Sequence, residues 1–221
     1  MGPGRPLLKV LVATSNPHKV REIDALLRGL PFDLVTLDAF PTIAAPEETG
    51  RTFEENARQK ALYYAAATRH LTVAEDSGLE IDALGGAPGV ESARFGGAST
   101  GYPEKFALIY ERLRALGQID SAARFVCALA LADGRGAQSG ADPTVVFTAR
   151  GVVEGRIARA PAGSGGFGYD PIFFYPPYGR TLAEATPEEK AAVSHRGIAF
   201  RALADFLVSG RGRGPEGPPP G

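Results

Sequence analysis

Two neighbouring carboxylates, Glu75 and Asp76, follow the apolar segment 71–74 and precede the dipeptide Ser77-Gly78. The apolar segment predicts a strand and the dipeptide predicts a turn, so the acidic pair is expected at a strand end. Like charges repel, and packing alone does not favour such a pair. Acidic residues are also common in solvated turns, so the pair alone is compatible with a structural and a functional interpretation. Together with Glu48, Asp76 could supply oxygen ligands for Mg²⁺, which takes one or two carboxylates plus substrate phosphates.

A second polar segment lies between a predicted strand and a predicted helix, and it carries hydroxyls, an amide and a lysine. A helix N-terminus presents unpaired N–H groups and a partial positive charge, so this segment suits a phosphate. A capped helix with a surface lysine explains the same residues. The chain contains no GxxxxGK[ST] pattern, which excludes a Walker A loop. The residues of this segment are Thr14, Ser15, Asn16, Pro17, His18 and Lys19.

A third polar region combines the glycine-rich segment 163–171 with donors further along the chain. Glycines permit close backbone approach to a ligand, and an aromatic ring near an aspartate could stack on a flat base and bind its edge. The alternatives are a satisfied interface histidine and a lysine on a solvated helix face. The candidate residues are Phe167, Gly168, Tyr169, Asp170, Lys190, His195 and Arg196.

The elements that position these residues begin with an apolar run at 7–13, broken only by Lys9, which predicts a strand buried on both faces. Asn16 suits an N-cap and Pro17 suits the first helical position. A second strand is predicted at 33–37. Strand, helix and strand in this order begin an α/β fold.

The remaining elements extend this pattern. Thr52 and Glu55 predict a capping box for a helix that ends near Thr68, with Asn56 and Lys60 one turn apart on a face other than its apolar face. We therefore predict a mixed α/β fold with a twisted sheet and helices on both sides. Further strands are predicted at 71–74, 79–84, 124–132, 144–153 and 172–175, and further helices at 103–116 (with Leu116 inward), from 186 and at 199–207.

Composition excludes several classes of function. The net charge of −1 gives no electrostatic case for nucleic acid or an acidic membrane surface. The single cysteine, Cys127, excludes a disulfide framework and is expected to be a buried small hydrophobe. No segment approaches the about 18 apolar residues of a membrane span, so we expect a cytoplasmic protein. Residues 1–209 are expected to form one domain, and 210–221, rich in Gly and Pro, a disordered tail.

Together these segments resemble the Ham1-like nucleoside triphosphate pyrophosphatases, which remove inosine and xanthosine triphosphates. That family carries a T-x-N-x-x-K or S-x-N-x-x-K turn, an E-T-G loop, an F-x-E-N-A helix with a following lysine, an E/D-D-S-G turn, G-G-F-G-Y-D-P and a terminal S-H-R. The order here is the same, and the resemblance spans about Lys9 to Leu207. The matching positions are Ser15, Asn16, Lys19, Glu48–Gly50, Phe53, Glu55–Ala57, Lys60, Glu75–Gly78, Gly165–Pro171 and Ser194–Arg196.

The resemblance implies Mg²⁺-dependent hydrolysis between the α and β phosphates, which releases pyrophosphate and a nucleoside monophosphate. It also implies a homodimer and a cleft between two lobes. By the family match, Asp76 helps to bind Mg²⁺ and orients or deprotonates the attacking water, Glu48 shares the metal, and Lys19 and Lys60 hold the triphosphate together with turn donors such as Ser77. Bound Mg²⁺ would then offset the repulsion within the acidic pair.

The base preference has a physical explanation too. Hypoxanthine and xanthine carry a 6-oxo acceptor where adenine carries a 6-amino donor, so a site with donors there rejects adenine. His195 and Arg196 are suitable donors, with Phe167 stacking and Asp170 accepting from the ring. Guanine also has a 6-oxo group, and its exclusion does not follow from these residues. A phosphatase that removes the terminal phosphate would need the same metal and lysines, whereas a nucleotide sensor would not need Glu48 and Asp76.

Overall fold

The computed structural model describes residues 8–136 and 140–210. Within this part of the chain, seven strands form one sheet in the order β2-β1-β3-β4-β5-β6-β7. β1 pairs in parallel with β2 and β3, and all later neighbours are antiparallel. The predicted mixed α/β sheet is confirmed. The strands are β1 (Leu8–Val12), β2 (Phe32–Thr36), β3 (Leu71–Ile81), β4 (Ala122–Asp133), β5 (Thr144–Ile157), β6 (Phe173–Tyr175) and β7 (Arg180–Thr181).

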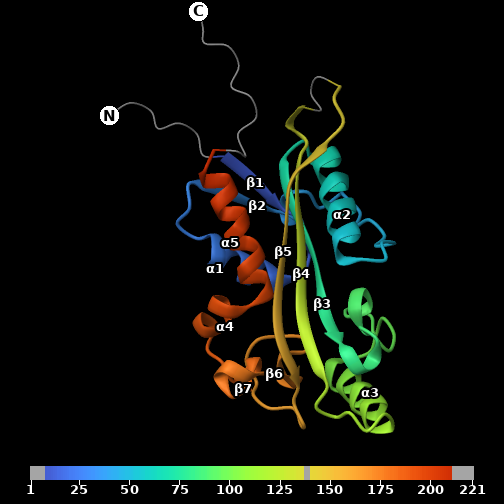
Figure 1. Cartoon of the computed structure of the whole chain (residues 1–221). Coiled ribbons are helices and arrows are strands. Elements are labelled where there is room, and N and C mark those ends of the chain that lie inside the picture. The colour runs from blue at the N-terminus through green and yellow to red at the C-terminus, as the bar shows by residue number, and fades with distance from the viewer. Residues whose placement is uncertain (1–7, 137–139, 211–221) are drawn as a thin grey trace, which may run out of the picture.

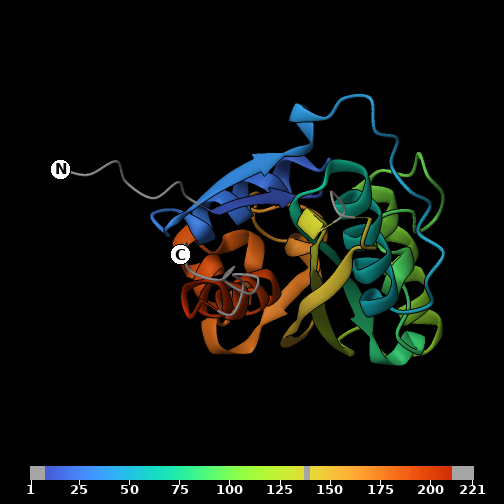
Figure 2. The ribbon, with the colours of Figure 1, turned by 90° about the horizontal axis from the view of Figure 1, so that it is seen from above.

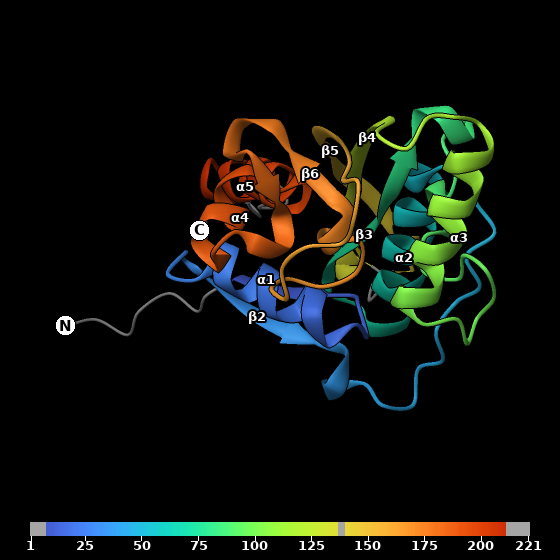
Figure 3. The same cartoon turned by 90° about the horizontal axis from the view of Figure 1, so that it is seen from below.

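Helices cover both faces of this sheet (Figure 1). α1 (Pro17–Leu27) and α5 (His195–Val208) lie on one face, and α2 (Phe53–Thr68) lies on the other. The view from above shows the sheet between these two helical layers (Figure 2). α3 (Tyr102–Ala115) lies on the same side of the sheet as α2 but toward the other end of the long strands, and α4 (Pro187–Val193) lies beside α5 (Figure 1 and Figure 3).

Side-chain alternation along the buried strands explains the layers. In β1, Val10 and Val12 belong to the core cluster of α1 and α5, whereas Leu11 belongs to the cluster of α2. Successive side chains of a strand point to opposite faces, so a continuous apolar run buries both. A third cluster joins α3 to β6 at the far ends of β3, β4 and β5. These long strands therefore connect two lobes, each with its own core.

The caps predicted at Asn16 and Thr52 are confirmed, the second with a correction. The Asn16 side chain accepts hydrogen bonds from the backbone N–H groups of residues 18 and 19, with Pro17 as the first residue of α1. Thr52 caps α2 by accepting from Glu55 N at 3.1 Å. The Glu55 carboxylate binds Arg51 N instead of Thr52 N, so the reciprocal half of the predicted box is missing.

The turn predicted at residues 75–78 was wrong. β3 runs without interruption from Leu71 to Ile81 and pairs with β4 along its whole length. Gly78 does not turn the chain; a Cβ there would lie 2.3 Å from Ser92 Oγ, so this glycine permits a close approach within the strand. The acidic pair therefore lies inside a paired strand.

Other boundaries differ for local reasons. α5 begins at His195 instead of 199, because the Ser194 hydroxyl accepts from Gly197 N and caps an earlier start. Leu116 is 55% exposed instead of inward, because α3 ends at Ala115. Residues 137–139, in the connection between β4 and β5, and residues 211–221 of the predicted tail lie outside the described residues. No described helix is long and apolar enough to cross a membrane.

Candidate active site

A cleft opens where β1 ends and β3 continues. The last β1 partner of β3 is Val12, which lies opposite Val73. Beyond this point β3 borders a cavity of about 310 Å³ at the boundary of the two lobes. Most of the predicted site residues line this cavity, and Pro17 and His18 do not. The lining includes Thr14, Ser15, Asn16, Lys19, Glu48, Lys60, Asp76, Ser77, Phe167, Gly168, Tyr169, Asp170, Lys190, His195 and Arg196.

Glu75 and Asp76 extend to opposite faces of the sheet, as adjacent strand residues do. Glu75 lies on the face of α1 and α5, where its Oε1 is 2.9 Å from Lys19 Nζ and 3.1 Å from Arg196 Nη2. Burial would raise the pKa of Glu75, but Arg196, Lys19 and Lys60 outweigh burial and hold this pKa well below its usual range. Lys19 and Arg196 thus balance the charge of Glu75, and Glu75 stays ionised without a bound Mg²⁺.

Asp76 lies on the face of α2 and meets different partners. Asn56 Nδ2 donates to Asp76 Oδ2 at 2.9 Å, and Lys60 Nζ lies 3.6 Å from Asp76 Oδ1. Lys60 also donates to Glu48 Oε1 at 2.6 Å. Burial raises the pKa of Asp76, and the opposing effects of Lys60 and Asn56 do not cancel it. For Lys60, burial lowers the pKa, but Asp76 and Glu48 raise it above its usual value.

The carboxylates of Glu48 and Asp76 fit a magnesium ion that also binds phosphate oxygens of a substrate. Glu48 and Asp76 border the same cavity and share Lys60 as an ion-pair partner. Across the described residues, no group of three or more His, Cys, Asp or Glu side chains could enclose a metal alone. Mg²⁺ typically binds one or two carboxylates and completes its shell with water and phosphate oxygens. A bound cation would also offset the free-energy cost of burying the ionised Asp76 carboxylate.

The loop at 163–171 is organised by Asp170. Its carboxylate, which is 2% exposed, accepts from Phe167 N at 2.7 Å and from Lys190 Nζ at 2.6 Å. Burial raises the pKa of Asp170 despite the opposing charge of Lys190. Gly166 has a φ of +67°, and a Cβ there would lie 2.1 Å from Asp170 Oδ2. Only glycine satisfies both conditions without strain.

The ring of Phe167 is surrounded by aromatic and cationic groups. The His18 ring stacks on it with a centroid distance of 5.1 Å and an interplanar angle of 22°. Lys190 Nζ lies 4.7 Å from the centroid of the Phe167 ring, and Arg196 Cζ lies 5.6 Å from it. His18 therefore belongs to the surroundings of the cavity through Phe167, although it does not line the cavity.

Sequence reasoning missed Glu22, a residue of α1. Glu22 accepts from Lys190 Nζ at 2.7 Å and from Arg196 Nη1 at 2.5 Å, so it holds two predicted base-binding side chains. Burial would raise the pKa of Glu22, but these two cations outweigh it and lower the pKa. The sequence does show that Glu22 is three residues from Lys19, and this spacing places both side chains on one side of the helix.

His195 begins α5 and is 6% exposed. Its ring stacks on Phe125 at a centroid distance of 4.9 Å, and its Nδ1 is buried without a hydrogen-bond partner among the described residues. Burial, reinforced by Arg196, lowers the pKa of His195 well below 6.5, so the imidazole is neutral near pH 7. His195 lines the cavity, and an unpaired buried nitrogen is unusual because buried polar groups in proteins are generally hydrogen-bonded.

The geometry agrees with the comparisons to known proteins. A family model described as the Ham1 family matches residues 10–206. A dITP/XTP pyrophosphatase from an Exiguobacterium species is 46% identical over 201 residues, covering 91% of this chain and 97% of that protein. One from Thermus thermophilus is 46% identical over 213 residues, covering 96% and 95%. The solved structure of a HAM1 protein from Coxiella burnetii is 41% identical, covers 92% of this chain and 100% of that one, and has a TM-score of 0.83. The chain belongs to the Ham1 family.

Proposed function

We propose that the protein hydrolyses the non-canonical purine nucleoside triphosphates ITP, dITP and XTP to the monophosphate and pyrophosphate, with Mg²⁺ as cofactor. The observation that carries this proposal is one cavity lined by two chemically different groups of residues. At what we call its phosphate end, Lys60 contacts Glu48 and Asp76, and at what we call its base end, Lys190 and Arg196 lie over the ring of Phe167. The names of the dITP/XTP pyrophosphatase relatives support the choice of substrate.

The phosphate end would perform the chemistry. Water attacks the α-phosphorus, the bond from that phosphorus to the α–β bridging oxygen breaks, and pyrophosphate leaves. Asp76 orients the water and accepts its proton; the raised pKa of this buried carboxyl makes it a better base than an ordinary aspartate. Mg²⁺, held by Glu48 and Asp76 when bound, would neutralise phosphate charge. Lys19, Lys60 and donors of the 14–19 turn and Ser77 would hold the triphosphate.

The base end would read the 6-oxo group. Phe167 offers a stacking surface, and Lys190, His195 and Arg196, which line the cavity, would supply the donors to the 6-oxo group. A donor that faces the 6-amino group of adenine is left unpaired, which disfavours ATP. Asp170 already accepts from Phe167 N and Lys190, so its first contribution is to hold the loop that carries the stacking ring.

The resemblance to the family further supports a homodimer that acts in the cytoplasm, where it would clear the nucleotide pool. We assign 1–209 to one catalytic domain and 210–221 to a dispensable tail. Light scattering coupled to gel filtration would measure the subunit number, and a monomer mass would refute the dimer.

A nucleotide panel tests the activity. ITP, dITP, XTP, ATP and GTP are incubated with the protein in Mg²⁺ or in EDTA, and the products are separated by anion-exchange chromatography. We expect IMP and pyrophosphate from ITP in Mg²⁺, slower turnover of ATP, and no turnover in EDTA. Inorganic phosphate and IDP as primary products would instead show a terminal phosphatase. An Asp76→Asn preparation, run in parallel, controls for contaminating hydrolases.

A further inference from the structure

Ser92 is a buried residue that contacts both the strand of Asp76, through Leu79, and the loop of Phe167, through Tyr169. It follows a short 3-10 turn, Gly89–Glu91, and is 5% exposed. Its hydroxyl accepts from Leu79 N at 2.9 Å and donates to Gly89 O at 2.6 Å. Leu79 lies three residues beyond Asp76 in β3, next to Gly78, whose missing side chain leaves the room that Ser92 occupies. The hydroxyl of Ser92 therefore holds the strand that carries the acidic pair.

The carbonyl of Ser92 faces the base loop. The Tyr169 hydroxyl donates to it at 2.9 Å, and Lys105 Nζ donates to it at 3.4 Å. Tyr169 lies between two residues of the predicted base site, Gly168 and Asp170, and is 3% exposed. Because its hydroxyl is bound to Ser92, Tyr169 anchors the loop.

Lys105 is the second donor to this turn and is itself 3% exposed. Its Nζ also donates to Ala93 O at 2.5 Å and lies 4.9 Å from the ring centroid of Tyr102, which packs against Tyr169. None of the ion pairs among the described residues involves Lys105. A buried ammonium group without a carboxylate partner is unfavourable. Its contacts are the carbonyl oxygens of this turn and one aromatic ring, so it fixes the turn.

We propose that Ser92 and Lys105 are positioning residues that set the spacing between the catalytic strand and the base loop. The inference deepens the proposed function and rests on it. The two ends are separable: the Ser92 hydroxyl acts on the strand of Asp76, whereas the Ser92 carbonyl, with Lys105 and Tyr169, acts on the loop of Phe167. Loss of a donor to the carbonyl should weaken base selection, and loss of the hydroxyl should slow the chemistry for every base.

The test compares Tyr169→Phe, Lys105→Met, their double variant and Ser92→Ala. We expect each loop variant to lower the ITP/ATP ratio of kcat/KM by about three- to tenfold, the range of one ordinary hydrogen bond. In the double variant this ratio should fall by less than the product of the two single changes, since both donors hold the same turn, Ser92–Ala93. Ser92→Ala should lower kcat for both nucleotides by the same factor. Unchanged ratios in the loop variants, or an additive double variant, would overturn the proposal.

Tyr110→Phe is the matched control, because the Tyr110 hydroxyl is also buried and donates to a backbone carbonyl, Ala158 O, at 2.8 Å. It should lose similar stability and keep the ITP/ATP ratio. Calorimetry measures the binding of IMP and AMP without turnover, and it tests the base site and the positioning role separately. A wild-type protein without preference for IMP refutes the base site itself. A wild-type preference that the folded Tyr169→Phe variant retains in full refutes the positioning role alone.

Discussion

Arg196 and Glu75 form a buried ion pair between the first turn of α5 and the middle of β3, with Arg196 Nη2 3.1 Å from Glu75 Oε1 and both side chains 1% exposed. Arg196 Nη2 also donates to Ser77 Oγ at 3.0 Å, and Nη1 binds Glu22. Burial would lower the pKa of Arg196, but Glu75 and other acidic neighbours raise it above its usual value. The pair fixes α5, and hence His195, against the strand that carries Asp76.

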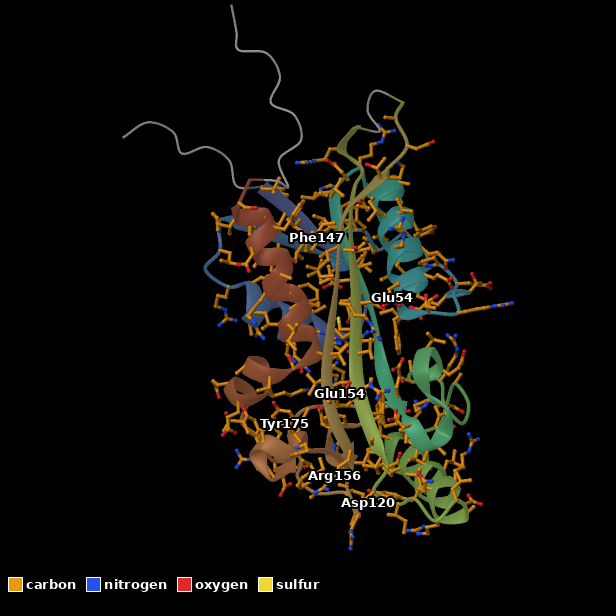
Figure 4. The ribbon with its side chains drawn as sticks, viewed as in Figure 1. Glu54, Asp120, Phe147, Glu154, Arg156 and Tyr175 are labelled. Atoms are coloured by element: carbon orange, nitrogen blue, oxygen red, sulfur yellow. The ribbon has the colours of Figure 1, made fainter. Side chains whose placement is uncertain are left out.

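Replacing Glu75 with Gln should destabilise the fold. Arg196 and Lys19 would lose their shared counter-charge, and breaking one side of a buried pair typically costs about 3–5 kcal/mol. Equilibrium urea unfolding measures the loss. Glu54→Gln is the matched control: Glu54 forms an exposed pair with Arg150 at 3.0 Å (Figure 4), and its loss should cost about 1 kcal/mol or less. Equal losses in the two variants would contradict the structural role of Glu75.

Replacing Asp76 with Asn should remove turnover and leave the protein as stable as before, or more so. The substitution removes the proposed base, worth about 10²–10⁴-fold in rate. Burial raises the pKa of Asp76, so its ionised form is disfavoured in the folded state, and a neutral side chain relieves that. Single-turnover kinetics and thermal melting test both parts. A rate within about tenfold of wild type would place the chemistry elsewhere. Glu154→Gln, at an exposed partner of Arg124 (Figure 4), should change neither quantity.

The sequence allowed a prediction of the sheet and helices because their signals are local. Apolar runs, the Asn16 cap and the Thr186 cap act within a few residues, and all three appear in the structure. The prediction of a turn at 75–78 was wrong because the pairing of β3 with β4 and the approach of Ser92 to Gly78 are tertiary contacts, which the local sequence does not show. A Ser-Gly dipeptide indicates a turn only where its backbone is not hydrogen-bonded to a neighbouring strand.

Most of the residues proposed for the site line one cavity, but their contacts were only partly predictable. The family motifs placed Lys19 and Lys60 near a ligand, the donors after the glycine-rich segment included Lys190, and all three line the cavity. The sequence does not show that Glu75 faces away from Asp76 toward Arg196, since this depends on strand phase and on how α5 packs. Glu22 was missed for the same reason: its partners are 168 and 174 residues away along the chain.

The stability of the protein should fall as the pH drops below about 6.5. Burial lowers the pKa of folded His195 well below 6.5, so the unfolded chain binds a proton there that the folded chain does not. The contribution is therefore present above pH 6.5 and is lost on acidification, with a limiting slope of about 1.4 kcal/mol per pH unit. Chemical unfolding between pH 5 and 7.5 measures it. His195→Gln should flatten this part of the profile; an unchanged slope would show that other groups cause it.

Truncation after Gly210 should leave the melting temperature and turnover unchanged. The segment beyond it is rich in Gly and Pro and offers little apolar surface to bury. Calorimetry and initial rates on the full and truncated chains provide the comparison. A fall in melting temperature of several degrees would show that this segment docks on the domain.

Arg196 has two separable roles, the proposed recognition of the base and the observed ion pairs with Glu75 and Glu22. An alanine would leave Glu75 and Glu22 without their shared cation, so lost activity could reflect misfolding. Arg196→Lys keeps the charge and removes the planar fork of donors. We expect it to lower the ITP/ATP ratio of kcat/KM, with a loss of about 1.5–3 kcal/mol for one hydrogen bond to a charged group.

Lys19→Gln is the matched comparison for Arg196→Lys, because Lys19 binds the same oxygen of Glu75 at 2.9 Å but lies in the proposed phosphate turn. A phosphate ligand serves every base equally, so this variant should lower kcat/KM for ITP and ATP by one common factor. Initial rates on both nucleotides, with melting temperatures to confirm folding, give the two ratios. If Arg196→Lys behaves like Lys19→Gln, then Arg196 acts through Glu75 and does not read the base.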